Sequence, residues 1–392
     1  MKICYCIAEY NPLHLGHVKH INYIKNSLGA EKLVVIMSGN FTQRGEPAVL
    51  NKFLRAKEAI ITGADAVIEL PTVFSVGNAE TFARGAINII TSLNAGDGIC
   101  FGVESGSKQD YLNLATALND ESKEFRSALK EFLSQGFSLA KAKYETVKKL
   151  NETEFNETLI SSPNNVLAIE YVKALLKIKS PLESFPMIRE GDHNDATLKK
   201  GITSATSIRM QIKSGALRKI KKCVPPYVFR DLKSATYPYA FDKMIMSSLI
   251  RTSAKDLSKV PDCTEGLENR IKALSKDNLS VASLVEKTTT KRYTSSRIRR
   301  ILLSNYLGIS SDLVNECLDS KLYAKILAVN NDSKDLVSTL AKSSSVPLIT
   351  RKSDTTSLKK TALECFNVDV RANDLYNLAT DEKINEHQTS FV

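Results

Sequence analysis

Two histidines three residues apart, His14 and His17, carry the strongest chemical signal in this sequence. Gly16 lies between them, and a glycine removes the Cβ that would keep a ligand away from the backbone. Imidazole rings at the start of a helix can hydrogen-bond to a phosphate that the backbone N–H groups also bind. They would stabilise the negative charge that develops on an α-phosphate as pyrophosphate leaves. We therefore take His14 and His17 as the candidate catalytic residues of a reaction at a nucleotide phosphate.

The residues around this pair predict the elements that position it. Residues 3–8 are apolar and predict a buried strand, Asn11-Pro12 predicts a turn, and a helical pattern begins beside Gly16. A strand, a tight turn and a helix N-terminus form the usual phosphate site of an open α/β sheet. As an isolated tetrapeptide, His-x-Gly-His is equally well explained by chance and surface histidines. Its place directly after a strand and a proline turn argues against chance, whereas the nearby His20 is expected on the solvent side of the helix.

Further apolar runs predict the rest of the fold. Strands are expected at 33–37, 66–71, 98–106 and 186–189, with helical patterns between them. This alternation predicts an α/β fold with a doubly wound parallel sheet. Beyond Pro225-Pro226 the pattern is mainly helical, over 241–252, 267–274, 281–287 and 295–307. We therefore predict one domain over residues 1–225 and a mainly α-helical domain over 226–392, whose tail from Leu336 is expected to pack back as a small α/β piece.

A second group of residues could bind the phosphates from the other side. Ser204, Ser207 and Arg209 lie at the start of a predicted helix, where hydroxyls and a guanidinium would clamp β- and γ-phosphates. Helix caps of this kind are common, so the serines are also explained as caps.

Four further residues each have two interpretations. Asn164 and Asn165 either contact a ligand or cap the helix that follows them. Arg189 follows an apolar strand and either pairs with a carboxylate or reaches a nucleotide phosphate. Gly102 either marks the end of a strand or allows a ligand to approach closely.

Positive charge is concentrated in one segment of this basic chain. The sequence has 54 lysines and arginines against 43 acidic residues, a formal net charge of +11. Residues 287–300 hold six basic residues, no acidic residue and a tyrosine that could stack on a base. Such a segment is often only a solvated face, but it is also well suited to RNA phosphates. The candidate RNA-binding residues are Lys291, Arg292, Tyr293, Arg297, Arg299 and Arg300.

Several other classes of protein are disfavoured. The seven cysteines are scattered and include no CxxC pair, which argues against a disulfide framework or a zinc site, and no all-protein metal site is visible. No apolar run approaches the roughly 20 residues needed to cross a bilayer. The N-terminus also lacks the features of a signal peptide, so a cytoplasmic protein is expected.

The motifs together resemble those of the bacterial tRNA(Met) cytidine acetate ligase family, within the wider superfamily of HxGH nucleotidyltransferases. The segments that carry the resemblance are spread over residues 1–300, and the long run at 37–48 is the most specific of them. They are Ala8-Glu9-Tyr10-Asn11-Pro12-Leu13-His14-Leu15-Gly16-His17, residues 37–48, Val67-Ile68-Glu69-Leu70-Pro71, Phe101-Gly102, Ser162-Pro163-Asn164-Asn165, residues 204–209, residues 265–271 and Lys291-Arg292-Tyr293-Thr294.

The resemblance implies a Rossmann-like nucleotidyltransferase domain that binds ATP, followed by a basic domain that binds tRNA. It implies that acetate attacks the α-phosphate of ATP, giving acetyl-adenylate and pyrophosphate. The acetyl group then passes to N4 of the wobble cytidine of elongator tRNA(Met), giving N4-acetylcytidine and AMP. Mg²⁺ is expected with the ATP phosphates. The resemblance does not locate acetate, and it places ATP on Ile7, Ala8, Glu9, Tyr10, Asn11, Pro12, Leu13, His14, Leu15, Gly16, His17, Val18, Lys19, His20, Gly102, one of Asn164 and Asn165, and Arg189.

Two other functions fit parts of the same pattern. A small-molecule adenylyltransferase would join AMP to a phosphorylated metabolite at the same histidines, but it would not need the basic segment. An RNA-binding protein without activity would not need the intact set of His14, Gly16 and His17.

Overall fold

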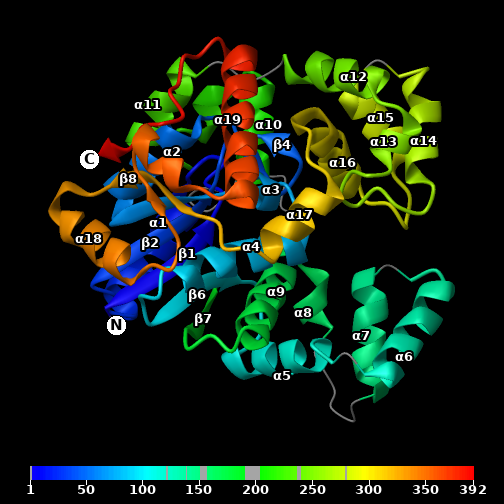
Figure 1. The fold of residues 1–392 in the computed structure, drawn as a ribbon, viewed down its shortest axis with the longest axis horizontal. Coiled ribbons are helices and arrows are strands. Elements are labelled where there is room, and N and C mark those ends of the chain that lie inside the picture. The colour runs from blue at the N-terminus through cyan, green and yellow to red at the C-terminus, as the bar shows by residue number, and fades with distance from the viewer. Residues whose placement is uncertain are drawn as a thin grey trace.

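A computed structural model describes residues 2–120, 122–137, 139–150, 157–189, 204–235, 240–278 and 280–392 (Figure 1). Its centre is an eight-stranded sheet, and seven of the strands follow the order β10-β8-β5-β2-β1-β6-β7, while β9 pairs with β8. The strands are β1 (Ile3–Ala8), β2 (Lys32–Ser38), β5 (Ala66–Leu70), β6 (Gly98–Val103), β7 (Glu183–Ile188), β8 (Ala324–Val329), β9 (Leu348–Ile349) and β10 (Ser390–Phe391). A separate hairpin pairs β3 (Phe41–Thr42) with β4 (Glu46–Pro47).

The sheet is covered on both faces, as the doubly wound prediction requires. Alternate residues of β1 enter two different apolar cores: Tyr5 packs with Val34 on one face, and Cys6 packs with Val35 on the other. Because side chains on both faces of these strands are buried, the strands are continuous apolar runs in the sequence. Strand β1 pairs in parallel with β2 and β6, so the carboxyl ends of these strands open at one edge. The α/β fold class is therefore confirmed.

Helices α1, α2, α10 and α11 contribute to one core, and α4, α5, α9 and the C-terminal helices contribute to the other (Figure 1). In the first part of the chain the helices are α1 (Leu15–Asn22), continued by a π-helical turn (Tyr23–Ser27), α2 (Lys52–Thr62), α3 (Thr72–Ser75), α4 (Ala79–Ser92), α5 (Lys108–Leu118), α6 (Lys123–Ser134), α7 (Leu139–Leu150), α8 (Thr158–Ser161), α9 (Pro163–Lys177) and α10 (Ala205–Lys213).

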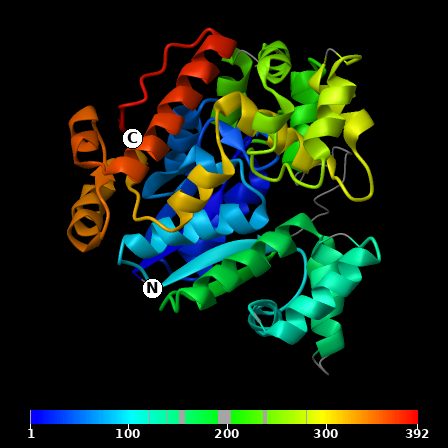
Figure 2. The same ribbon diagram turned by 45° about the vertical axis from the view of Figure 1, so that its right-hand side comes forward.

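The chain beyond residue 225 is mainly helical up to Leu318, in agreement with the helical pattern of the sequence. Its helices are α11 (Pro226–Ser234), α12 (Phe241–Arg251), α13 (Ala254–Leu257), α14 (Leu267–Ser275), α15 (Val281–Thr288), α16 (Ser295–Leu307), α17 (Ser311–Leu318), α18 (Lys334–Ser343) and α19 (Lys360–Thr380). Short 3₁₀ turns lie at Leu217–Ile220, Asn331–Ser333 and Lys352–Ser357. Figure 2 shows α12–α16, coloured green to yellow, grouped beside the sheet, and α19, in red, packs against α3, α16 and α17.

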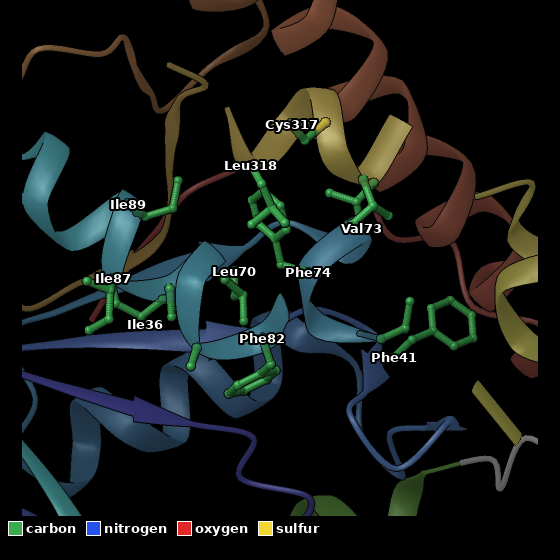
Figure 3. Close-up of a cluster of buried hydrophobic side chains, with 14 of the residues drawn as sticks. Ile36, Phe41, Leu70, Val73, Phe74, Phe82, Ile87, Ile89, Cys317 and Leu318 are labelled. Carbon is green, nitrogen blue, oxygen red and sulfur yellow. The ribbon is translucent and has the colours of Figure 1, made fainter. Parts of the chain in front are cut away.

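The expected packing of the tail as a small α/β piece is seen, but this piece joins the central sheet and begins at β8, before the predicted Leu336. Strand β8 pairs antiparallel with β5, and β9 and β10 pair with β8, so the last part of the chain completes the central sheet. The side chains agree: Cys317 and Leu318 of α17 pack in the same core as Val73 and Phe74 of α3 (Figure 3). The domain limit at 225/226 stays a prediction, but residues 324–391 belong with the sheet.

A buried group of charges fastens these C-terminal residues to the sheet. Lys52 of α2 lies 2.7 Å from both Glu69 of β5 and Glu386 of the C-terminal tail. Lys325 of β8 lies 3.0 Å from Glu69 and is also paired with Glu386. All four side chains are at most 3% exposed, so each charge depends on the others for compensation.

Candidate active site

The turn after β1 brings His14 and His17 together by local hydrogen bonds. His14 is the N-cap of α1, and its Nδ1 accepts the N–H of Gly16 at 3.1 Å. The backbone N–H of His14 in turn donates to Nδ1 of His17 at 3.2 Å, and the two rings stack with centroids 3.7 Å apart. Because both Nδ1 atoms act as acceptors, each neutral imidazole carries its proton on Nε2. The pair therefore presents Nε2–H donors, the form that a phosphate oxygen requires.

Gly16 is needed for this arrangement because of its neighbour. A Cβ at residue 16 would lie 2.8 Å from Cε1 of His14, closer than packed atoms allow. The glycine thus permits the His14 ring to fold back over its own helix. The sequence predicted that Gly16 lets another group approach the backbone closely. In the structure the group that approaches it is the imidazole of His14.

Arg55 of α2 holds the loops around the pair, and the sequence reasoning missed it. Its fully buried guanidinium donates to the carbonyls of Glu9 at 2.6 Å and Ser38 at 3.1 Å, and also to that of Gly39. These carbonyls lie where β1 and β2 end, so one side chain satisfies three backbone acceptors at the edge of the sheet. The sequence did contain one signal for it: an arginine among the apolar positions of an amphipathic helix indicates a buried, functional side chain.

A cavity of about 350 Å³ opens at this edge of the sheet, within the size range of small-molecule sites. Many of the residues predicted to bind ATP line it: Ile7, Ala8, Glu9, Tyr10, Asn11, His14, Gly16, His17, Lys19, His20, Gly102, Asn164, Arg189 and Arg209. Others predicted with them do not: Pro12, Leu13, Leu15, Val18, Asn165, Ser204 and Ser207. Lining residues that the sequence reasoning did not name as site residues are Gln43, Arg44, Phe82, Phe101, Pro163, Leu167, Tyr171, Met187, Ile188, Ala205 and Ser296.

His20 corrects the expectation that it faces solvent. Its Nε2 lies 3.3 Å from Sγ of Cys100 in β6, and its ring lines the cavity. Burial, with the nearby charge of Arg189, lowers the pKa of His20 to about 4. The imidazole is therefore neutral at physiological pH, and it forms part of the cavity wall.

Arg189 and Gly102 lie against each other in neighbouring strands. The backbone N–H of Arg189 continues the pairing of β7 with β6 by donating to Val103 at 2.8 Å. A Cβ at Gly102 would lie 2.8 Å from Cδ of Arg189, so the missing side chain gives room for this arginine. Burial lowers the pKa of Arg189, yet a guanidinium stays charged and presents a cation to the cavity.

The two adjacent asparagines have different surroundings. Asn165 is buried, its Oδ1 accepts the N–H of Glu104 at 2.9 Å, and its Nδ2 donates to the Thr158 carbonyl at 3.1 Å. Asn164 donates to the Glu104 carboxylate and lines the cavity. The N-cap of α9 is Ser162, so neither asparagine caps that helix. Asn165 therefore organises the loop, and of the two asparagines Asn164 is the one that lines the cavity.

The serines and the arginine of α10 also have different surroundings. Ser204 caps the helix by accepting the N–H of Ser207 at 3.1 Å, and the two hydroxyls lie 3.0 Å apart in a buried position. Ser204 is therefore the cap and Ser207 its partner, and of these three residues only Arg209 lines the cavity. Arg209 donates to the carbonyl of Asn11 at 2.9 Å, which connects α10 to the turn after β1. The loop that joins Arg189 to this helix, with His193, lies outside the described residues.

Comparisons with known proteins agree with this geometry. The model of the family described as HIGH Nucleotidyl Transferase matches residues 1–390. A protein of Clostridium acetobutylicum named tRNA(Met) cytidine acetate ligase is 36% identical, with 96% of each chain covered. This chain belongs to the tRNA(Met) cytidine acetate ligase family. A second member, from Acetivibrio thermocellus, is 37% identical over 90% of this chain and 89% of its own.

Solved structures of the family share the complete fold. The apo crystal structure of Thermotoga maritima TmcAL superposes with a TM-score of 0.95 at 26% identity and covers all of both chains. A second crystal structure of the same protein, bound with alpha-thio ATP, gives a TM-score of 0.92 with the same coverage. The family fold therefore includes the C-terminal strands and helices of this chain, and a member of the family binds an ATP analogue.

The basic segment of this family member adjoins the cavity through the first turn of α16, where Ser296 is a lining residue. Its arginines already have partners within the chain. Arg292 is paired with Glu265 at 2.8 Å, Arg300 with Asp262 at 3.1 Å, and Arg299 with Glu46. The remaining candidates also differ in exposure: Lys291 is exposed, and the guanidinium of Arg297 stacks 5.3 Å from the ring of Tyr293. Contact of these residues with tRNA stays a prediction.

Two further findings apply to the described residues alone. Within them, no group of three His, Cys, Asp or Glu side chains is arranged to hold a metal ion. The helices of that same part of the chain are all too short or too polar to cross a lipid bilayer. All seven cysteines are buried and free.

Proposed function

We propose that this chain is the ATP-dependent ligase that its family name describes. It activates acetate as acetyl-adenylate and transfers the acetyl group to N4 of the wobble cytidine of elongator tRNA(Met). The observation that carries the proposal is 36% identity over 96% of the chain with a protein of that name. The imidazole pair at the cavity supports it independently, because adenylation needs donors at an α-phosphate.

The adenylation step falls to the residues at the edge of β1, β6 and β7. His14 and His17 direct Nε2–H donors at the α-phosphate as acetate attacks and pyrophosphate leaves. Arg189, Arg209 and Lys19 supply the positive charge that stabilises the triphosphate, since all three line the cavity. Asn164 provides a neutral amide beside them. The described lining residues offer a single carboxylate, so Mg²⁺ would be held mainly by the phosphates of the ATP that brings it.

The acetyl-transfer step requires tRNA beside the same cavity. The basic segment supplies the electrostatic attraction, and Ser296 marks where this segment adjoins the cavity. Lys291 and Arg292 are its best-placed cations because both are exposed, and the ion pair of Arg292 with Glu265 lies at the surface. Arg299 and Arg300 have a structural role first, since they are paired with Glu46 and Asp262. The reaction takes place in the cytoplasm, where tRNA is used.

One experiment separates this function from its alternatives. The protein is incubated with ATP and labelled acetate, with and without total tRNA. Label in cytidine only when tRNA is present supports the ligase. Transfer of AMP to a phosphorylated metabolite would instead support a small-molecule adenylyltransferase, and absence of any ATP turnover would leave an RNA-binding protein.

Variants test how the work is divided between the two parts of the site. His17→Ala should lower acetate-dependent ATP–pyrophosphate exchange by about 100-fold or more and leave tRNA affinity near that of the unmodified protein. The double variant K291E/R292E should weaken tRNA binding, spare the exchange, and reduce the slope of log Kd against log salt by about 1 to 2. The matched control is K57E/K342E, which makes the same change of charge on exposed lysines of α2 and α18. Equal loss of tRNA affinity in both double variants would contradict the role of the basic segment.

A further inference from the structure

Glu9 is an unusual side chain in this cavity because of its charge. Among the described lining residues it is the only one with a carboxylate, while Lys19, Arg44, Arg189 and Arg209 all carry positive charge. Oε1 of Glu9 accepts the backbone N–H of Gln43 at 2.8 Å. Within the described part of the chain, its carboxylate accepts no other hydrogen bond, so Oε2 has capacity for a donor from a substrate.

The triphosphate of ATP and acetate do not explain this carboxylate, and a contact with the ribose or adenine donors of ATP would show as a loss in the adenylation half-reaction. ATP and acetate are both anions, and a carboxylate in the same cavity repels them. An ionised carboxylate accepts hydrogen bonds and donates none, so it offers nothing to phosphate or acetate oxygens. The third reactant of the proposed function is an amine, and an exocyclic cytosine amine is a natural donor to Glu or Asp.

Three aromatic side chains, buried among apolar neighbours, form part of the cavity wall that a cytosine ring would contact. Phe82 of α4, Phe101 of β6 and Tyr171 of α9 all line the cavity, and the rings of Phe101 and Tyr171 have centroids 5.7 Å apart. Burial, followed by the negative charge of Glu9, raises the pKa of Tyr171, so this phenol and the carboxylate share one environment. Bases taken out of a stack are commonly held on aromatic side chains.

The loop that positions Glu9 is also in contact with the basic segment. Gln43 and Gly45 lie between β3 and β4, and a Cβ at Gly45 would meet the Arg299 backbone at 2.6 Å. This loop therefore packs directly on α16, whose first turn contributes Ser296 to the cavity. A polynucleotide bound along the basic segment would reach the cavity next to Glu9.

We propose that Glu9 is the general base of the acetyl-transfer step. This inference rests on the proposed function. Oε2 of Glu9 accepts a hydrogen bond from the N4 amine of the cytosine, whose ring lies against Phe82 and Tyr171. The N4 lone pair forms a bond to the acetyl carbon, the bond between that carbon and the phosphate oxygen breaks, and AMP leaves with the electron pair. The N4 proton passes to Glu9 and then to solvent.

The test measures the two half-reactions separately in Glu9→Gln, which keeps the oxygen that accepts from Gln43. Adenylation is followed by acetate-dependent ATP–pyrophosphate exchange and by trapping acetyl-adenylate with hydroxylamine, a strong nucleophile that needs little help from a base. Transfer is followed as N4-acetylcytidine formed in a single turnover on tRNA. We expect the transfer rate to fall about 100-fold, while exchange and acetohydroxamate formation fall less than about tenfold. Glu124→Gln on exposed α6 is the matched control and should leave all three rates unchanged.

Two results would overturn the inference. Transfer within a few-fold of the unmodified protein would show that no base is needed at Glu9. Equal loss of all three rates would make Glu9 a ligand of ATP or, if raised Mg²⁺ restores the rates, of the metal that accompanies ATP. Thermal melting of Glu9→Gln shows whether the variant is folded, and Glu9→Asp serves as a second variant, which should recover part of the transfer rate. Failure of the proposed function itself is distinct, since the unmodified protein would then form no N4-acetylcytidine.

Discussion

Replacing Gly102 by alanine should weaken ATP binding by displacing Arg189. The new Cβ would lie 2.8 Å from Cδ and 3.0 Å from Cγ of that arginine, whereas ordinary contacts are 3.4–4 Å. The side chain must therefore move by several tenths of an ångström, which misaligns its guanidinium. A hydrogen bond to a charged group contributes about 1.5–3 kcal/mol, so the loss corresponds to about a tenfold to hundredfold rise in the Kd for ATP.

A double-mutant cycle tests whether the effect passes through Arg189. The third-nearest atom to the added Cβ is Nε of the same arginine at 3.7 Å, so other groups are in ordinary contact or further away. In an Arg189→Ala background the extra methyl should therefore cost nothing. The measurement is calorimetric titration of G102A, R189A and the double variant with a non-hydrolysable ATP analogue, with thermal melts as the control for folding. If G102A weakened binding equally in both backgrounds, the explanation through Arg189 would be refuted.

The other predictions concern buried charged groups, and the first is tested by Lys325→Met. That change leaves Glu69 and Glu386 with Lys52 as their remaining partner and should lower the free energy of unfolding by about 3–5 kcal/mol, measured by urea denaturation. Lys342→Met on the surface is its control, and a loss no larger than that of the control would contradict the role of the cluster. Glu58 of α2 is buried with no hydrogen-bond partner for its carboxyl oxygens among the described residues, and burial together with Asp231 raises its pKa to about 8. Because the folded state holds this proton more tightly, stability falls as pH rises from about 4.5 to 8. Glu58→Gln should therefore be more stable than the unmodified protein at pH 8, with an advantage that shrinks toward pH 5. An advantage of equal size at both pH values would show that the proton is not involved.

The sequence was informative wherever local interactions set the structure. Strand β1 covers the predicted residues 3–8, and α16 covers the predicted 295–307. His14 and His17 are joined by hydrogen bonds within one helical turn, which is why their spacing alone indicated that they act together. The same holds for Ser204 and Ser207, whose capping geometry spans three residues.

Contacts between distant residues were beyond sequence reasoning. The choice between Asn164 and Asn165 depends on where Glu104 and Thr158 lie. The solvent side predicted for His20 was wrong because β6 brings Cys100 against its ring. Strand β8 was not predicted because a lysine usually indicates a surface position. Lys325 is buried instead, and Glu69 and Glu386 neutralise its charge.

The sequence by itself determined the parallel strands β1, β2, β5, β6 and β7, the imidazole pair and the family, because each is encoded in neighbouring residues or in motifs. The tertiary structure alone decided which of the predicted residues share one cavity, that Glu9 is the only carboxylate among its described lining residues, and that the C-terminal strands complete the sheet. These features depend on side chains that are far apart in the chain, and the periodicity of the sequence carries no information about which of them will meet.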